Sequence, residues 1–66
     1  MDWLTQLREM RETSAVILTW HPGGFCSCAV IAIPEMKGLA YATGADESEV
    51  VGACFVTWDQ AKRMAA

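Results

Sequence analysis

Stretches without charge alternate with charged ones along this chain, and the most apolar pattern is a run of nine uncharged residues, 25–33. Gly23 and Gly24 precede it and Pro34 ends it. An uncharged run of this length between turn residues predicts a buried strand. Its side chains are apolar or small on both faces, which places it at the centre of a small sheet.

The preceding residues predict a helix and a partner strand. Asp2 can cap a helix that runs through about residue 12, and its apolar residues follow helical spacing: Trp3, Leu4, Leu7 and Met10. Residues 15–20 are rich in β-branched side chains and predict a strand. Residues 21–24 predict a turn, with His21 exposed in it, so the two strands form an antiparallel hairpin.

After the central strand we expect a loop at residues 34–38 and a third strand at residues 39–43. Residues 46–66 allow two alternatives. Helical periodicity places Val50, Val51, Cys54 and Trp58 on one arc, with Asp46 and Glu49 near a capping box. The β propensity of residues 50–58, together with Gly52, supports a fourth strand followed by a short helix. We favour the helix.

These elements predict an α+β fold of order α-β-β-β-α, formed by one domain over residues 1–66. The sheet has three antiparallel strands, and two helices pack on one of its faces. Neither face of the first two strands is polar. The face without helices should therefore expose apolar side chains, which is typical of an interface, and a homodimer is one way to cover it.

Composition narrows the class of function. The net charge is −3, which argues against direct nucleic-acid binding, because that requires clustered Lys and Arg. No apolar run approaches the ~20 residues of a membrane-spanning helix, and the N-terminus lacks the basic start of a secretion signal. Three cysteines, an odd number, fit free thiols in a reducing compartment. We expect a cytoplasmic protein without membrane contact, in the host cytoplasm if a phage encodes it.

Catalytic and metal chemistry have few candidates. Cys26 and Cys28 share one face of the central strand and, with Cys54 or His21, offer zinc ligands, but the paired spacing of a zinc site is missing. Buried structural thiols are the simpler interpretation. His21 has no marked nucleophile or orienting carboxylate. We therefore predict no enzyme activity, no metal site and no cofactor.

Acidic residues are the better candidates for binding. Asp46, Glu47 and Glu49 lead the last predicted helix, where the helix dipole already explains them. Alternatively they imitate phosphates and bind a basic groove of another protein. The predicted partner-binding residues also include an interface anchor and two further acids: Trp20, Glu35 and Asp59.

Two motif-level resemblances bear on function. Gly24-Phe25, residues 34–38, Gly44 and the acidic residues 47–49 resemble the N-terminal domain of HicB-type antitoxins, which implies neutralisation of a toxin ribonuclease. The element order is similar to that of double-stranded-RNA-binding domains, although acids stand where those domains carry bases at the start of the last helix. In overall character (small, acidic, without a catalytic set) the chain also resembles phage-encoded inhibitors such as anti-CRISPR proteins.

Three hypotheses follow from these observations. The first is a non-enzymatic inhibitor that binds a nucleic-acid-handling protein through an acidic and partly apolar surface. The second is a HicB-like antitoxin fragment that neutralises a toxin ribonuclease. The third is a nucleic-acid-binding module with a double-stranded-RNA-binding-like fold.

Overall fold

The structure, a computed structural model, describes residues 2–65. The ends of the predicted domain and of its last helix, Met1 and Ala66, lie outside the described residues. The elements follow in the order α1 (Trp3–Arg11), β1 (Ser14–His21), β2 (Phe25–Ala32), β3 (Lys37–Gly44) and α2 (Glu47–Ala65).

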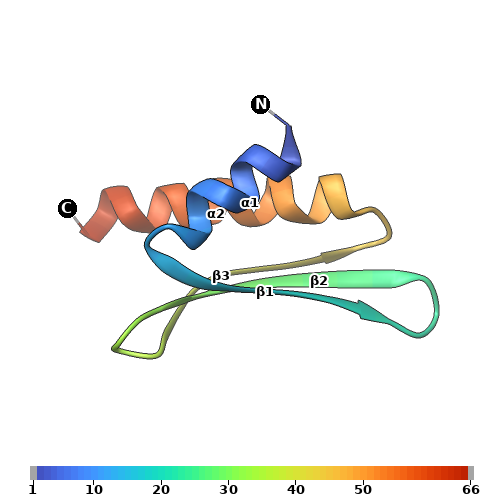
Figure 1. Cartoon of the computed structure of the whole chain (residues 1–66), viewed down its shortest axis with the longest axis horizontal. Coiled ribbons are helices and arrows are strands. Elements are labelled where there is room, and N and C mark those ends of the chain that lie inside the picture. Colours follow the sequence, from blue (N-terminus) through green and yellow to red (C-terminus); the bar gives the residue numbers. More distant parts are fainter. Residues whose placement is uncertain (1, 66) are drawn as a thin grey trace.

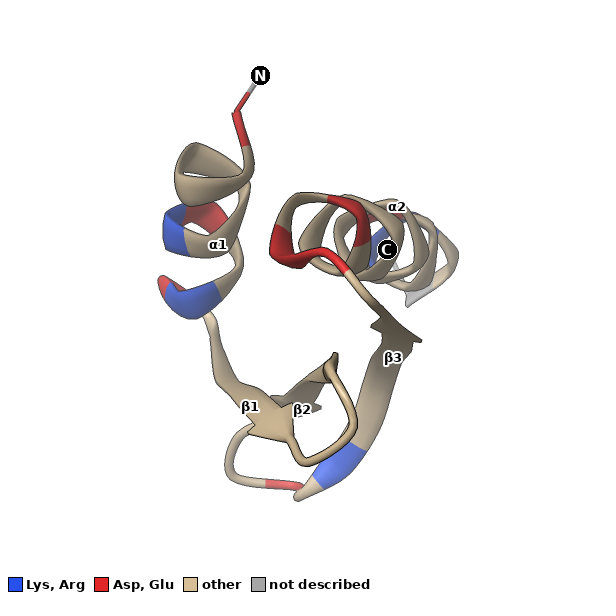
Figure 2. Ribbon diagram, turned by 90° about the vertical axis from the view of Figure 1, so that its right-hand side faces the viewer, with Lys and Arg blue, Asp and Glu red and all other residues tan. Residues whose placement is uncertain are grey.

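The predicted α+β fold is confirmed. Within residues 2–65 the sheet has three strands in the order β1-β2-β3, and both strand pairs are antiparallel. Helices α1 and α2 lie on the same side of this sheet (Figures 1 and 2). Helix α2 contacts β2, β3 and α1, whereas α1 contacts β1 and α2.

The last element is a helix, as the periodicity favoured, and the β propensity of residues 50–58 is overridden. Its predicted arc is buried at Val50, Val51, Cys54 and Trp58, while Val56, off that arc, is exposed. Burying a complete apolar stripe against the sheet outweighs the small propensity differences of single residues. The predicted capping box is not seen in the described residues, because the Asp46 carboxylate accepts a hydrogen bond from the Ser48 hydroxyl at 2.6 Å.

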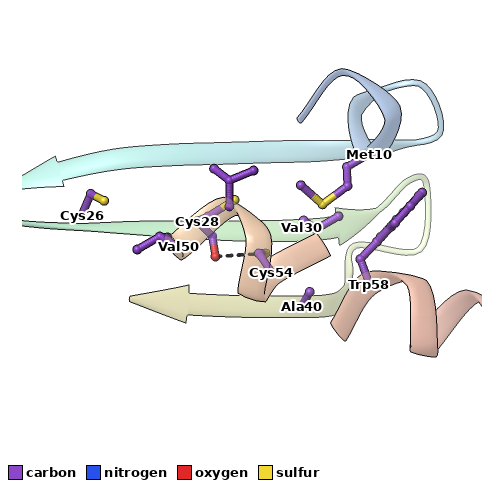
Figure 3. Close-up of a cluster of buried hydrophobic side chains, with 9 residues drawn as sticks. Met10, Cys26, Cys28, Val30, Ala40, Val50, Cys54 and Trp58 are labelled. Carbon is purple, nitrogen blue, oxygen red and sulfur yellow. Dashed lines mark hydrogen bonds between the residues drawn. The ribbon is translucent and has the colours of Figure 1, made fainter. Parts of the chain in front are cut away.

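The core lies between the sheet and the two helices (Figure 3). Met10 of α1 and Trp58 of α2 are buried with Cys26, Cys28 and Val30 of β2. Trp58 is held further by its indole N–H, which donates to the Ser14 hydroxyl at 3.3 Å, and by the Lys62 ammonium 4.4 Å from its ring centroid. The central strand is therefore buried by the helices on one of its two faces.

The strands begin and end slightly away from the predicted residues. β1 and β3 are longer than expected, because backbone pairing with β2 extends to His21 in β1 and to Lys37 and Gly44 in β3. β2 ends at Ala32, one residue earlier than predicted. The expectation of an exposed turn histidine was wrong, because His21 belongs to β1 and is partly buried.

The hairpin turn therefore consists of residues 22–24 alone. Gly23 and Gly24 have φ values of +97° and +81°, in the left-handed region where a side chain is strained. This turn joins the end of β1 to the start of β2. It lies at the same end of the molecule as the start of α2 (Figure 1).

The face of the sheet away from the helices is the apolar surface that the sequence predicted. Across its middle run Ile17, Ala29 and Tyr41, which pair directly in register and therefore share this face. Ile17 and Tyr41 are exposed, as is Phe25 at the hairpin end. We call this side of the three strands, which carries Ile17, Phe25, Ala29 and Tyr41, the open face.

Candidate functional site: an acidic corner beside an exposed tryptophan

The site is built where β3 passes into α2. Gly44 ends β3 opposite Cys26, and Ala45 and Asp46 connect it to the first turn of α2. A Cβ atom on Gly44 would lie 3.0 Å from a Val50 methyl group, so strand and helix approach each other closely here. This close approach sets the acids that begin α2 against the end of the sheet.

Trp20 stands beside these acids. It pairs with Cys26 and therefore faces the helices, but α2 begins only at Glu47 and leaves the ring largely uncovered. The indole N–H donates a hydrogen bond to Glu47 Oε1 at 2.9 Å. Trp20 remains 61% exposed. The structure thus holds a large exposed aromatic group in one orientation.

We name the group formed by Trp20, Asp46, Glu47 and Glu49 the acidic corner. Asp46 and Glu49 are exposed, and Glu47 is partly covered by its contact with the indole. The positive end of the α2 dipole favours negative charge at this position. Burial raises the pKa of the nearby Cys26 thiol, and the negative charges of Glu47 and Asp46 raise it further. The corner is therefore locally electronegative.

Acids and bases are mixed over most of the described chain, whereas the first turn of α2 carries acids alone. Arginines lie on α1, Lys37 begins β3, and the basic residues of α2 lie in its last turn: Lys62 and Arg63. Figure 2 shows acidic residues at the start of α2 and a mixture of acidic and basic residues on α1. A basic partner that approaches the acidic corner therefore meets an uncompensated negative surface.

The structure brings together four of the six predicted binding residues. Glu35 lies in the loop between β2 and β3, at the opposite end of the sheet from the hairpin turn (Figure 1). Asp59 lies further along α2, where its carboxylate is 3.0 Å from Arg63 Nε, so its charge is paired. The six predicted residues therefore do not form one surface, because Glu35 and Asp59 lie away from the other four.

The sequence predicted an exposed apolar face but left undecided which residues form it: Ile17, Phe25, Ala29 and Tyr41. Their alternation with the buried positions of β2 was visible in the chain. That signal gave two possible faces, and the packing of the helices decides which one is exposed.

His21 and Ser27 form a polar contact on the open face, at the hairpin end of the sheet. His21 Nε2 lies 2.8 Å from the Ser27 hydroxyl, and the imidazole stacks on Phe25 with 4.6 Å between ring centroids. Ser27 is buried, so this hydrogen bond satisfies a hydroxyl that water reaches poorly. An acyl-transfer site would also need an orienting carboxylate and oxyanion donors.

The cysteines are buried thiols. In the described chain Cys26, Cys28 and Cys54 are all free, and the Cys54 thiol donates to the Cys28 carbonyl oxygen at 3.5 Å (Figure 3). The neighbouring Cys28 side chain and burial raise the pKa of Cys54. Among residues 2–65, no three side chains of histidine, cysteine, aspartate or glutamate gather in a geometry suited to a metal ion.

Neither helix in the described residues has the length and apolarity required to cross a bilayer. Comparison with protein-family models, curated proteins and solved structures finds no match to this chain. The acidic corner and the open face are the features of this chain that bear on its function.

Proposed function

We propose that this chain is a non-enzymatic cytoplasmic inhibitor that binds a nucleic-acid-handling protein. The acidic corner enters a basic groove of the partner and takes the place of nucleic-acid phosphates. Its mode of action is that of small acidic phage inhibitors such as anti-CRISPR proteins. The observation that carries this proposal is Trp20, which is exposed yet held by a hydrogen bond to Glu47, one of the carboxylates that begin α2.

Such an arrangement suits binding for two physical reasons. Tryptophan is among the residues that contribute most to interface energy, and the hydrogen bond to Glu47 fixes its orientation before the partner arrives. Ordering a side chain on binding costs about 0.5–1.5 kcal/mol, so an anchor that is already ordered avoids much of that cost. The surrounding carboxylates add long-range attraction to a basic groove, which raises the association rate.

The test is charge reversal with a matched control. One variant carries Asp46→Lys, Glu47→Lys and Glu49→Lys, and the control carries Glu9→Lys, Glu12→Lys and Glu35→Lys. Both sets change the net charge equally, but the control acids lie on α1, at its C-cap and in the β2–β3 loop. Each immobilised protein is used to capture partners from a bacterial lysate, and captured proteins are identified by mass spectrometry.

We expect the wild type and the control to retain a partner with a basic groove, and heparin to displace it. The corner variant should lose that partner. Lysines oppose the helix dipole at the start of α2, so a second variant with Asp46→Asn, Glu47→Gln and Glu49→Gln removes charge with less risk to folding. Capture that survives in both corner variants would disprove phosphate imitation.

The HicB-like alternative has one structural observation in its favour. The segments that carry the resemblance lie where elements begin or end: Gly24-Phe25 at the hairpin turn, residues 34–38 in the β2–β3 loop and the start of β3, Gly44 at the end of β3, and residues 47–49 at the start of α2. An antitoxin fragment should restore growth when co-expressed with its cognate toxin ribonuclease. Rescue that persists in the corner variant would favour this alternative over the first.

The third alternative rests on the α-β-β-β-α order, which double-stranded-RNA-binding domains share. The acids at the start of α2 oppose phosphate binding at the equivalent place. A gel shift with double-stranded RNA or DNA at low salt tests it, and a shift that disappears with added salt would support this alternative.

A further inference from the structure

The strongest unused feature of the molecule is the open face of the sheet. Each strand contributes eight residues to the sheet. With a rise of ~3.3 Å per residue and a strand spacing of ~4.8 Å, the face covers roughly 26 by 14 Å. In the described residues its strand positions carry no aspartate, glutamate, lysine or arginine. This is an uncharged, largely apolar surface whose packing partner is unassigned.

The shape across the middle of this face is a trough between two ridges. Ala29 lies on the central strand, between Ile17 on β1 and Tyr41 on β3. The next row repeats the pattern with a small central side chain, since Ser27 lies between Thr19 and Thr43. Tyr41 is the tallest of these groups and is 67% exposed. A bulky side chain therefore stands beside a groove lined by small ones.

We propose that this face binds a second copy of the chain. A two-fold axis between β2 and β3, parallel to the strands, places Tyr41 of each copy over the Ala29 trough of the other. One contact then generates the second by symmetry, as in any isologous interface. Ile17 lies at the periphery of this packing and Ser27 on the floor of the trough.

The charge distribution of the chain permits a second copy at this position. The chain carries a net charge of −3, so two copies repel each other wherever their acids meet. The acidic corner opens beside the start of α2, on the helix side of the sheet. The open face is the uncharged approach, and packing through it leaves both acidic corners free for the proposed partner.

The small area of the open face limits the strength of the association. The open face offers roughly 370 Å² of flat surface per copy, against about 800 Å² per partner in a standard interface. The β2–β3 loop bends toward the same side of the sheet (Figure 1) and carries the exposed apolar residues Ile33 and Met36, which enlarge the contact. We therefore expect a concentration-dependent dimer with a dissociation constant on the order of micromolar or weaker.

The decisive variant fills the trough. Ala29→Leu makes the open face more apolar but blocks the seat of the partner's Tyr41, so the dissociation constant should rise at least about tenfold. The matched control is Ala53→Leu, the same change at an exposed position of α2. Nonspecific apolar association would instead strengthen in Ala29→Leu, so the sign of the change separates the two explanations.

The measurement is sedimentation equilibrium from about 10 µM to about 1 mM, a range suited to weak interfaces. The wild type and Ala53→Leu should rise from the monomer mass of 7.2 kDa toward twice that value. Ala29→Leu and Tyr41→Ser should stay near the monomer mass. Tyr41→Ser is the safeguard if Ala29→Leu fails to fold by circular dichroism, because Tyr41 lies mostly in solvent in the monomer.

A spectroscopic signal identifies the surface directly. The chain has one tyrosine, so fluorotyrosine incorporation gives a single fluorine resonance, from Tyr41. That resonance should move with concentration in the wild type and stay fixed in Ala29→Leu. A wild type that is monomeric up to about 1 mM, or an Ala29→Leu protein that associates as tightly as wild type, would overturn the proposal. The acidic-corner variants should still dimerise, so this test is independent of the proposed function.

Discussion

Replacing Gly52 by alanine tests the element that the sequence left open between helix and strand. Gly52 lies inside α2 and is partly buried against α1. A Cβ atom built there would meet Gln6 Oε1 at 3.8 Å, which is an ordinary van der Waals contact. Alanine therefore fits without displacing a neighbour, and the main change is in the intrinsic helix propensity of this residue.

The expected gain is about 1 kcal/mol, because glycine inside a helix is less favourable than alanine by ~0.8–1.0 kcal/mol. A domain of this length has a free energy of unfolding of roughly 3–10 kcal/mol, so the gain is a sizeable fraction of it. The midpoint of thermal unfolding should rise by about 4–8 °C. Urea denaturation followed by circular dichroism at 222 nm measures the same difference through linear extrapolation.

Gly24→Ala is the matched control. A Cβ atom on Gly24 has open space around it, since nothing lies within 4 Å, but its φ of +81° is strained for alanine. We expect this variant to lose about 1–2 kcal/mol through backbone conformation alone. The same substitution should therefore have opposite signs at the two positions. A Gly52→Ala protein that is destabilised would refute a continuous helix packed as described here.

Three further predictions concern the core, the thiols and the first helix. Trp58→Ala removes the largest buried side chain and should cost about 3–5 kcal/mol, enough to leave a large unfolded fraction in the circular dichroism spectrum. The buried thiols should react with a disulfide reagent slowly in the native protein and reach all three equivalents in denaturant: Cys26, Cys28 and Cys54. The hydrogen bond from the backbone N–H of Thr5 lowers the pKa of Asp2 from 3.8, so its contribution to stability is present above that pH and lost as the pH falls below it. The difference in melting temperature between wild type and Asp2→Ala should therefore shrink on acidification from about pH 5 to about pH 2, and a constant difference would exclude the cap as its cause.

The cap and most of the apolar stripe of α1 could be predicted from the sequence because both depend on neighbouring residues, but Leu4 of that predicted stripe is exposed. Asp2 accepts from the Thr5 backbone N–H at 2.7 Å, as its place before Trp3 predicted. The uncharged run of β2 was equally local, since its charge pattern and flanking glycines are properties of the chain itself. The positions that the sequence placed less accurately are the strand ends, because pairing with β2 extends them beyond their own propensity.

The candidate site was predictable in its charges and unpredictable in its grouping. Trp20 and Glu47 are twenty-seven positions apart in the chain. They come into contact because the chain passes from β3 into α2 after Gly44, beside the end of β1. In the sequence, Glu35 and Asp59 could not be distinguished from Glu47, because all three are acidic residues. The loop between β2 and β3 carries Glu35 away from the corner, and Arg63 neutralises Asp59.

The sequence by itself determined the order of the elements, the buried arc of the last helix and the presence of more apolar surface than two helices can cover. These follow from periodicity and length, which act over a few residues. Only the tertiary structure decided which face of the sheet the helices cover, because a strand with apolar side chains on both faces can pack either way. That choice buries Cys28 and Val30, exposes Tyr41 beside Ala29, and sets Trp20 against Glu47.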